Sequence, residues 1–181
     1  MRIISGKYKG RHIPVRKKFS ARPTTDFAKE NLFNILSNHI DFEETSALDL
    51  FSGTGSIGYE FASRGCTRVD LVEKDPRSVE FIKGVITRLG MDNVRVIKSD
   101  AFRFIEKCNQ IYHIIVADPP YEMMRINEIP DLIFSGNLLH QDGWFILEHS
   151  AKYSFASHSH YVELRKYGSV HFSFFSATQK K

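Results

Sequence analysis

The sequence has few cysteines and no long apolar run. Its 181 residues include two cysteines, Cys66 and Cys108, which stand in no C-x-x-C spacing. We therefore expect reduced, structural thiols rather than a disulfide framework. No apolar stretch approaches the roughly 20 residues that a membrane helix needs, and the N-terminus lacks the apolar segment of a secretory signal. These absences predict a cytoplasmic protein that does not enter the membrane.

Metal-ligand patterns are also scarce. The eight histidines include His158 and His160, but no cysteine or third histidine follows at a ligand spacing, so we predict no metal site. There are no repeats, low-complexity tracts or linkers. With 42% hydrophobic residues, the chain can bury one substantial core, and we expect a single main domain that acts as a monomer.

Positive charge gathers at the front of the chain. The first 25 residues contain no acid, whereas the other 156 carry 17 basic against 21 acidic side chains. Together with Tyr8, His12 and Phe19, this charge suits the phosphate backbone of a nucleic acid with bases to stack on, although a solvated arm would have the same composition. The candidate RNA-binding residues are Arg2, Lys7, Lys9, Arg11, Arg16, Lys17, Lys18 and Arg22.

The rest of the chain predicts an α/β fold. Residues 1–24 read as a basic, hairpin-like extension, and residues 25–181 as the main domain, opening with an amphipathic helix over about 25–39. From Ala47 onward, continuously apolar strands alternate with helices, which indicates a mostly parallel, doubly wound sheet. Near the end of the chain, "HYVELRKYG" and "SVHFSFFSA" have no helix between them and are joined by a Tyr-Gly-Ser turn, which predicts an antiparallel hairpin at the edge of the sheet.

A glycine motif follows the first strand. In "LDLFSGTGSIG" the spacing of Gly53, Gly55 and Gly58 matches a dinucleotide-binding loop. However, Asp49 would lie where a dinucleotide places its pyrophosphate, and two negative groups repel. S-adenosylmethionine, which has a cationic amino acid moiety and no phosphate, gains from the same carboxylate. We therefore predict this cofactor, with Asp49, Gly53 and Gly55 beside it.

The ends of the next two strands complete the predicted cofactor site. Glu73 can accept hydrogen bonds from both ribose hydroxyls, while Asp100, Ala101 and Phe102 are placed to meet the edge and face of the adenine. Asp100 could also cap the following helix, a common role for aspartate.

The fourth strand ends in "VADPPY". The Asp118 carboxylate and the Pro119 carbonyl can accept hydrogen bonds from the amino group of a nucleic acid base, holding its nitrogen in line with a reactive methyl group. Two prolines stiffen the loop, and Tyr121 offers a ring on which a flipped base can stack. We predict direct methyl transfer without a covalent intermediate, with Asp118, Pro119 and Tyr121 as the catalytic residues.

The combination of motifs resembles a known family. "LDLFSGTGSIGYEFASRG" and "DPPY" look like S-adenosylmethionine-dependent amino-methyltransferases. Together with "MRIISGKYKGRHI", "RPTTD" and "LFNIL" they resemble the RsmD family, which methylates the N2 amino group of one guanine in 16S ribosomal RNA of the small subunit. The resemblance runs from Met1 to about Tyr121 and is weaker in "GWFILEHS" and "RKYG".

The resemblance implies a Rossmann-like methyltransferase fold, S-adenosylmethionine as donor and the site residues named above. It adds Arg22, Pro23 and Thr24 of "RPTTD" as candidates beside the cofactor and the target base. The family usually follows this motif with a basic residue, whereas this chain has Phe27. No side-chain cation can act at that position here.

Three alternatives remain open. DNA adenine-N6 methylation is the closest, because the same loop handles either amino group, although no extra DNA-reading domain is evident. A nicotinamide-dependent oxidoreductase would need Asp49 to tolerate a pyrophosphate. A non-enzymatic RNA-binding module would keep the fold and the basic segment without binding S-adenosylmethionine.

Overall fold

Helices and strands alternate along most of the chain. A computed structural model describes residues 1–15 and 26–178. Its elements are α1 (Asp26–Leu36), β1 (Ser46–Leu50), α2 (Ser56–Ser63), β2 (Arg68–Glu73), α3 (Pro76–Leu89), β3 (Val94–Lys98), α4 (Ala101–Lys107), β4 (Tyr112–Ala117), α5 (Ile129–Ser135), β5 (Leu139–His149), β6 (Tyr161–Tyr167) and β7 (Val170–Ser176), with short 3-10 turns at Phe42–Glu44 and Ile126–Glu128. The first helix ends at Leu36, three residues before the expected end.

The strands form one sheet in the order β3-β2-β1-β4-β5-β7-β6. The first five pair in parallel, while β7 runs antiparallel to both β5 and β6. This arrangement confirms the expected parallel sheet with an antiparallel C-terminal hairpin. The strand order reverses between β1 and β4, and ligands of open α/β sheets bind at such a point, beyond the carboxyl ends of the strands.

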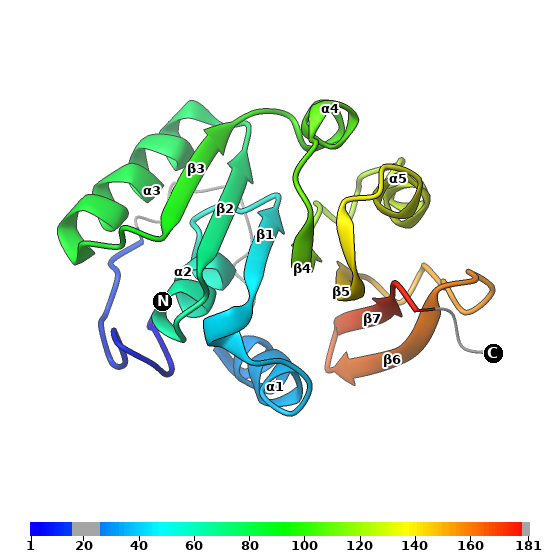
Figure 1. Cartoon of the computed structure of the whole chain (residues 1–181), viewed down its shortest axis with the longest axis horizontal. Coiled ribbons are helices and arrows are strands. Elements are labelled where there is room, and N and C mark those ends of the chain that lie inside the picture. The colour runs from blue at the N-terminus through cyan, green and yellow to red at the C-terminus, as the bar shows by residue number, and fades with distance from the viewer. Residues whose placement is uncertain (16–25, 179–181) are drawn as a thin grey trace.

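Helices cover both faces of the sheet (Figure 1): α1, α2 and α3 lie on one side, and α4 and α5 on the other. Because successive side chains of a strand point to opposite faces, β4 contributes to both cores. Its Ile114 and Val116 belong to the cluster under α1–α3, and Ile115 and Ala117 to the cluster under α4 and α5. This alternation explains why the strands read as continuously apolar.

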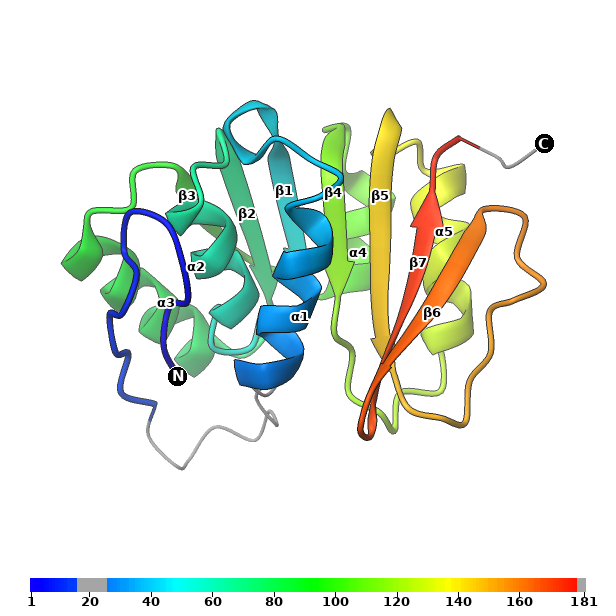
Figure 2. The ribbon, with the colours of Figure 1, turned by 90° about the horizontal axis from the view of Figure 1, so that it is seen from below.

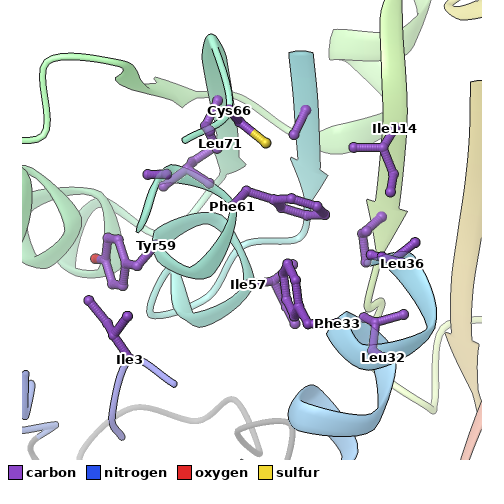
Figure 3. Close-up of a cluster of buried hydrophobic side chains, with 14 of the residues drawn as sticks. Ile3, Leu32, Phe33, Leu36, Ile57, Tyr59, Phe61, Cys66, Leu71 and Ile114 are labelled. Carbon is purple, nitrogen blue, oxygen red and sulfur yellow. The ribbon is translucent and has the colours of Figure 1, made fainter. Parts of the chain in front are cut away.

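The core under α1–α3 also contains the start of the chain. Figure 3 shows Leu32 and Phe33 of α1 facing α2, and Ile3 beside Tyr59 at the other flank of α2. Ile3 is 2% exposed and Ile13 is 1% exposed. Ile3 and Ile13, on either side of the turn in the N-terminal segment, are therefore buried together with α1–α3.

The N-terminal segment, residues 1–15, lies along α2 (Figure 2). It folds back on itself through a single antiparallel bridge between Arg2 and His12. The fully buried carboxylate of Glu60 accepts hydrogen bonds from the backbone N–H groups of Ile4 at 2.8 Å and Ser5 at 3.0 Å. The segment is thus fixed on the domain by backbone hydrogen bonds as well as by its apolar side chains.

Three further findings concern the part of the chain that the structure describes. No helix there has the length and apolar character needed to cross a membrane. No three His, Cys, Asp or Glu side chains gather there as a metal ion would require. Both cysteines are free thiols, and Cys66 is buried.

Candidate active site

A cavity of about 640 Å³ opens at the carboxyl ends of the parallel strands. It brings together eight of the ten catalytic and cofactor-binding residues expected from the sequence. From the cofactor set it is lined by Asp49, Gly53, Glu73, Asp100 and Ala101, and from the catalytic set by Asp118, Pro119 and Tyr121. The two sets come from four different strand ends, so the parallel sheet is what makes them neighbours.

Two described residues of the expected cofactor set, Gly55 and Phe102, do not line the cavity. Gly55 starts α2 in the left-handed conformation with φ 81°, and a Cβ there would lie 2.6 Å from the Tyr59 ring. The Phe102 ring packs edge-on against Phe51, 6.3 Å between centroids, and under the guanidinium of Arg125 at 4.1 Å. Gly55 therefore serves the helix start, and Phe51 rather than Phe102 faces the cavity.

Asp49 is a carboxylate at the cavity's buried end. It is 2% exposed, and its Oδ2 accepts a hydrogen bond from the N–H of Gly58 at 3.2 Å. Burial raises the pKa of Asp49 to about 8, and the nearby Glu73 acts in the same direction. A buried carboxyl of this kind gains strongly from a cation, because a cation stabilises its ionised form.

Glu73 ends β2 and is oriented by the backbone around it. Its Oε2 accepts from the N–H of Gly53 at 2.8 Å, and its Oε1 accepts from the N–H of Asp75 at 2.7 Å. These two bonds fix the Glu73 carboxylate next to the backbone of the glycine loop. Each oxygen keeps further lone-pair directions, because a carboxylate has about four acceptor sites.

Asp100 caps helix α4. Its Oδ1 accepts from the N–H groups of Phe102 at 3.0 Å and Arg103 at 3.3 Å. The capping role foreseen from the sequence is therefore present, and Asp100 also lines the cavity.

The loop Asp118–Tyr121 is attached at both ends. The N–H of Asp118 donates to the carbonyl of Leu50 at 3.4 Å, which ties the loop to the end of β1. The hydroxyl of Tyr121 donates to Oε1 of Glu148 on β5 at 3.0 Å. With Pro119 and Pro120 between these anchors, the acceptors of the loop and the Tyr121 ring have defined positions.

The cavity lining is strongly acidic. Among the described residues, it contains seven carboxylates and a single cation, Lys74. The carboxylates are Asp49, Glu73, Asp75, Asp100, Asp118, Glu122 and Glu148. Such a lining repels phosphate groups and favours ligands that bring hydrogen-bond donors or positive charge.

The expected RNA-binding residues fall into two groups. Arg2, Lys7, Lys9 and Arg11 are exposed on the N-terminal segment, while Arg16, Lys17, Lys18 and Arg22 lie outside the described residues, as do Pro23 and Thr24. Met1 lies by the glycine loop, with its sulfur 3.8 Å from the hydroxyl of Thr54, whereas the N–H of Lys7 donates to Ser63 at the far end of α2. The eight residues of α2 that lie between these points span about 12 Å at 1.5 Å per residue, so the backbone of Lys7 lies farther from the cavity than Met1 does.

Three residues near the site were not expected from the sequence. Glu148, 4% exposed, lines the cavity, and its only sequence signal is an acid inside an apolar strand. Phe51 also lines the cavity and has φ 62°, which no sequence pattern indicated. Lys29 is buried at 1% exposure, and its signal is a charge on the apolar face of α1.

Comparison with known proteins agrees with the resemblance seen in the motifs. The family model described as "Conserved hypothetical protein 95" matches residues 1–176. Ribosomal RNA small subunit methyltransferase D of Buchnera aphidicola (subsp. Baizongia pistaciae) is 33% identical over 148 residues, 82% of this chain and 75% of that protein. The protein of the same name from Escherichia coli K12 is 36% identical over 145 residues, 80% of this chain and 69% of that one.

Solved structures share the fold. A hypothetical protein of Thermus thermophilus superposes with a TM-score of 0.86 at 27% identity, covering 97% of this chain and 99% of that one. An RNA methyltransferase from Salinibacter ruber in complex with S-adenosyl-L-homocysteine has a TM-score of 0.67 at 15% identity, covering 88% and 96%. The chain therefore belongs to the RsmD family, that of ribosomal RNA small subunit methyltransferase D, and has the Rossmann-like fold of S-adenosylmethionine-dependent methyltransferases.

Proposed function

We propose that this protein transfers a methyl group from S-adenosylmethionine to the exocyclic N2 amino group of one guanine in 16S ribosomal RNA. Its membership of the RsmD family supports the ribosomal RNA substrate. The observation that carries the proposal is that Asp49 and Glu73 line the same cavity as Asp118 and Tyr121. In this proposal, the site for the methyl donor and the site for the amino group adjoin.

The residues at the cavity's buried end fit S-adenosylmethionine. Asp49 is positioned for an ammonium group, and Glu73, held by two backbone N–H groups, for the ribose hydroxyls. The acidic lining accepts a cationic ligand without phosphate, which is what separates this donor from a dinucleotide. When bound, S-adenosylmethionine supplies an electrophilic methyl group.

The loop Asp118–Tyr121 acts on the other reactant. The amino group of a base is a weak nucleophile because its lone pair is delocalised into the ring. The Asp118 carboxylate and the Pro119 carbonyl accept its N–H bonds, orient the nitrogen and stabilise the positive charge that develops on it. The Tyr121 ring, held by its bond to Glu148, gives the flipped base a surface to stack on.

The exposed cations of the N-terminal segment serve the RNA backbone in this proposal. Arg2, Lys7, Lys9 and Arg11 are presented on a segment that Glu60 fixes to α2, so their spacing from the cavity is set. The positive charge of the N-terminal segment and the negative charge of the cavity lining thus separate backbone binding from base recognition. Phosphates bind along the surface, and only the base enters the acidic cavity.

DNA adenine-N6 methylation is the nearest alternative, since the loop accepts either amino group. A nicotinamide-dependent oxidoreductase is disfavoured by the seven carboxylates of the lining, which oppose a pyrophosphate. A binding module without catalysis leaves the cofactor residues and the anchored loop without a role.

Transfer of labelled methyl groups tests the proposal. Small subunits from cells that lack this gene, naked 16S RNA and duplex DNA are each incubated with the protein and labelled S-adenosylmethionine, and the products are digested to nucleosides. Label in N2-methylguanosine is expected. If naked 16S RNA accepts more label than small subunits do, the RNA is modified before assembly, and the reverse result indicates modification after assembly. Label in N6-methyladenine, or RNA binding without any transfer, would contradict the proposal.

A further inference from the structure

Glu148 is a buried carboxylate in the half of the cavity that holds the Asp118–Tyr121 loop. It is the second-last residue of β5, is 4% exposed and lines the cavity. Burying a carboxylate is unfavourable unless it is hydrogen-bonded. Tyr121 gives it one such bond, at 3.0 Å, and this bond leaves room for others because a carboxylate has about four acceptor sites.

The sheet register places Glu148 beside Asp118. Strands β4 and β5 are parallel neighbours with Val116 paired to Ile146 and Ala117 to Leu147. Asp118 directly follows β4, and its N–H still donates to the Leu50 carbonyl of β1, so extending the register by one residue would place it beside Glu148, about 4.8 Å away at the backbone. Both positions share the parity of Val116 and Ile146, whose side chains belong to the core under α1–α3, so the two carboxylates project to the same side.

Two neighbouring carboxylates match one edge of guanine. Guanine presents its N2 amino group next to the N1–H group, so two adjacent positions both donate. Adenine and cytosine present an amino group next to a ring nitrogen that accepts. An acceptor facing such a nitrogen is repelled, and the mismatch inside a buried site is severe.

Building on the function proposed above, we propose that Glu148 selects guanine by accepting a hydrogen bond from N1–H while Asp118 accepts from the N2 amino group. Glu148 then touches the substrate directly, and the Tyr121 hydroxyl holds its carboxylate in place. The pair recognises the base by its donors, whereas the Tyr121 ring would stack on any base.

A guanine analogue tests this role. Once the methylated nucleotide is mapped, 16S RNA is assembled by ligation with guanosine or 2-aminopurine riboside at that position. 2-Aminopurine keeps the 2-amino group but has a bare N1 lone pair in place of N1–H. The wild-type protein should prefer guanosine by at least about 100-fold in kcat/KM, because the lone pair faces the Glu148 carboxylate.

Glu148→Gln should reduce this preference about tenfold or more, since an amide can either accept from N1–H or donate to a bare N1. Tyr121→Phe separates direct recognition from positioning. It keeps the ring and the Glu148 carboxylate and removes only the hydroxyl that positions this carboxylate, so it should slow both substrates and reduce the preference much less than Glu148→Gln does. Glu163→Gln, the same change on β6 outside the cavity lining, should behave as wild type. Thermal unfolding and S-adenosylhomocysteine affinity show that each variant is folded.

The outcomes separate this inference from the function on which it rests. If the wild-type protein does not methylate guanosine RNA, the proposed function is wrong. If it does, but tolerates 2-aminopurine equally or keeps its full preference in Glu148→Gln, only the role of Glu148 is wrong. Equal losses of preference in Tyr121→Phe and Glu148→Gln would make Glu148 a positioning residue for Tyr121.

Discussion

The ammonium group of Lys29 donates a 2.7 Å hydrogen bond to the backbone carbonyl of Arg2. Its second bond, 3.1 Å long, reaches the hydroxyl of Ser56, which lines the cavity at the start of α2. A buried cation in α1 therefore joins the N-terminal segment to the rim of the candidate active site. Burial lowers the pKa of Lys29, while the negative charges of Glu60 and Asp26 act in the opposite direction and favour its charged form.

Replacing Lys29 should loosen this junction. Lys29→Met leaves the Arg2 carbonyl and the Ser56 hydroxyl without their donor, which we expect to destabilise the fold by about 2–3 kcal/mol. For a domain of this size, the melting temperature should fall by about 4–12 °C. Lys83→Met is the matched control, because the exposed Lys83–Glu80 pair should contribute less than about 1 kcal/mol. Similar melting temperatures for the two variants would show that Lys29 does not join these elements.

The turn at Gly6 tests how tightly the segment is seated on α2. Gly6 and Gly10 both have φ 78°, so alanine is strained to the same degree at either position. At Gly6, however, a Cβ would lie 1.8 Å from the Ser63 carbonyl oxygen, whereas at Gly10 it would meet nothing within 4 Å. Gly10→Ala should cost about 1–2 kcal/mol, and Gly6→Ala considerably more.

Limited proteolysis followed by mass spectrometry measures the release of the segment directly. We expect early cleavage within residues 1–15 in Gly6→Ala and slow cleavage in Gly10→Ala. Equal cleavage and equal unfolding free energies in the two variants would mean that the packing against Ser63 does not hold the segment.

Asp49 should make stability depend on pH. Its pKa is about 8 in the folded protein against an ordinary value of 3.8. Between these values, the folded protein keeps a proton that the unfolded chain has lost, so stability falls as pH rises, by up to about 1.4 kcal/mol per pH unit. Urea unfolding from pH 5 to 8 should show a shallower decline in Asp49→Asn. Parallel curves for the two proteins would contradict this assignment.

The same group should couple cofactor binding to pH. A bound ammonium favours ionised Asp49, so S-adenosylmethionine affinity should rise by up to about tenfold per pH unit as pH approaches 8. The same binding titrations with Asp49→Asn are the control. The rise due to Asp49 should disappear in this variant, and any pH dependence that remains comes from ionisation of S-adenosylmethionine itself. A rise of equal size in the variant would assign the effect to another group.

Cations of the N-terminal segment should control the salt dependence of RNA binding. Changing Lys7, Lys9 and Arg11 together to Gln removes exposed charges, so the fold should be preserved. The slope of log affinity against log salt should become shallower by about 1 for each phosphate that the variant no longer neutralises, measured on 16S RNA between about 50 and 200 mM salt.

Two further triple variants locate the phosphate-binding cations. The first changes Arg16, Lys17 and Lys18, which precede α1 in the chain, to Gln. This change should also make the slope of log affinity against log salt shallower. The exposed cations Lys83, Lys107 and Lys152 belong to other parts of the domain, and the same change there should leave the slope as in wild type. If all three triples reduce it equally, RNA binding follows net charge rather than the N-terminal segment.

The architecture and much of the site could be predicted from sequence because they follow from the ends of parallel strands. Asp49, Glu73 and Asp118 stand in or directly after apolar strands, and a parallel sheet necessarily brings such positions to one edge. The antiparallel hairpin was likewise predictable, because no helix separates its two strands.

Other features depend on side-chain directions that spacing does not determine. Phe102 follows the capping residue Asp100, but its ring turns toward Phe51 instead of lining the cavity, and Gly55 serves the helix start. Glu148 and Lys29 did carry a signal, since each is a charge in an apolar pattern. Their partners, Tyr121 and Arg2, are 27 residues away in each case, and only the folded chain shows the pairing.

The most direct test of the account separates binding from transfer at Asp118. Asp118→Ala is compared with wild type for S-adenosylhomocysteine affinity and for methyl transfer to guanine in small subunits from cells lacking the gene. We expect nearly unchanged affinity and a loss of transfer of at least about 100-fold, because the carboxylate acts on the amino group and not on the cofactor. Transfer close to the wild-type rate, or a parallel loss of cofactor binding, would contradict the proposal that Asp49 and Glu73 bind S-adenosylmethionine while Asp118 acts on the base.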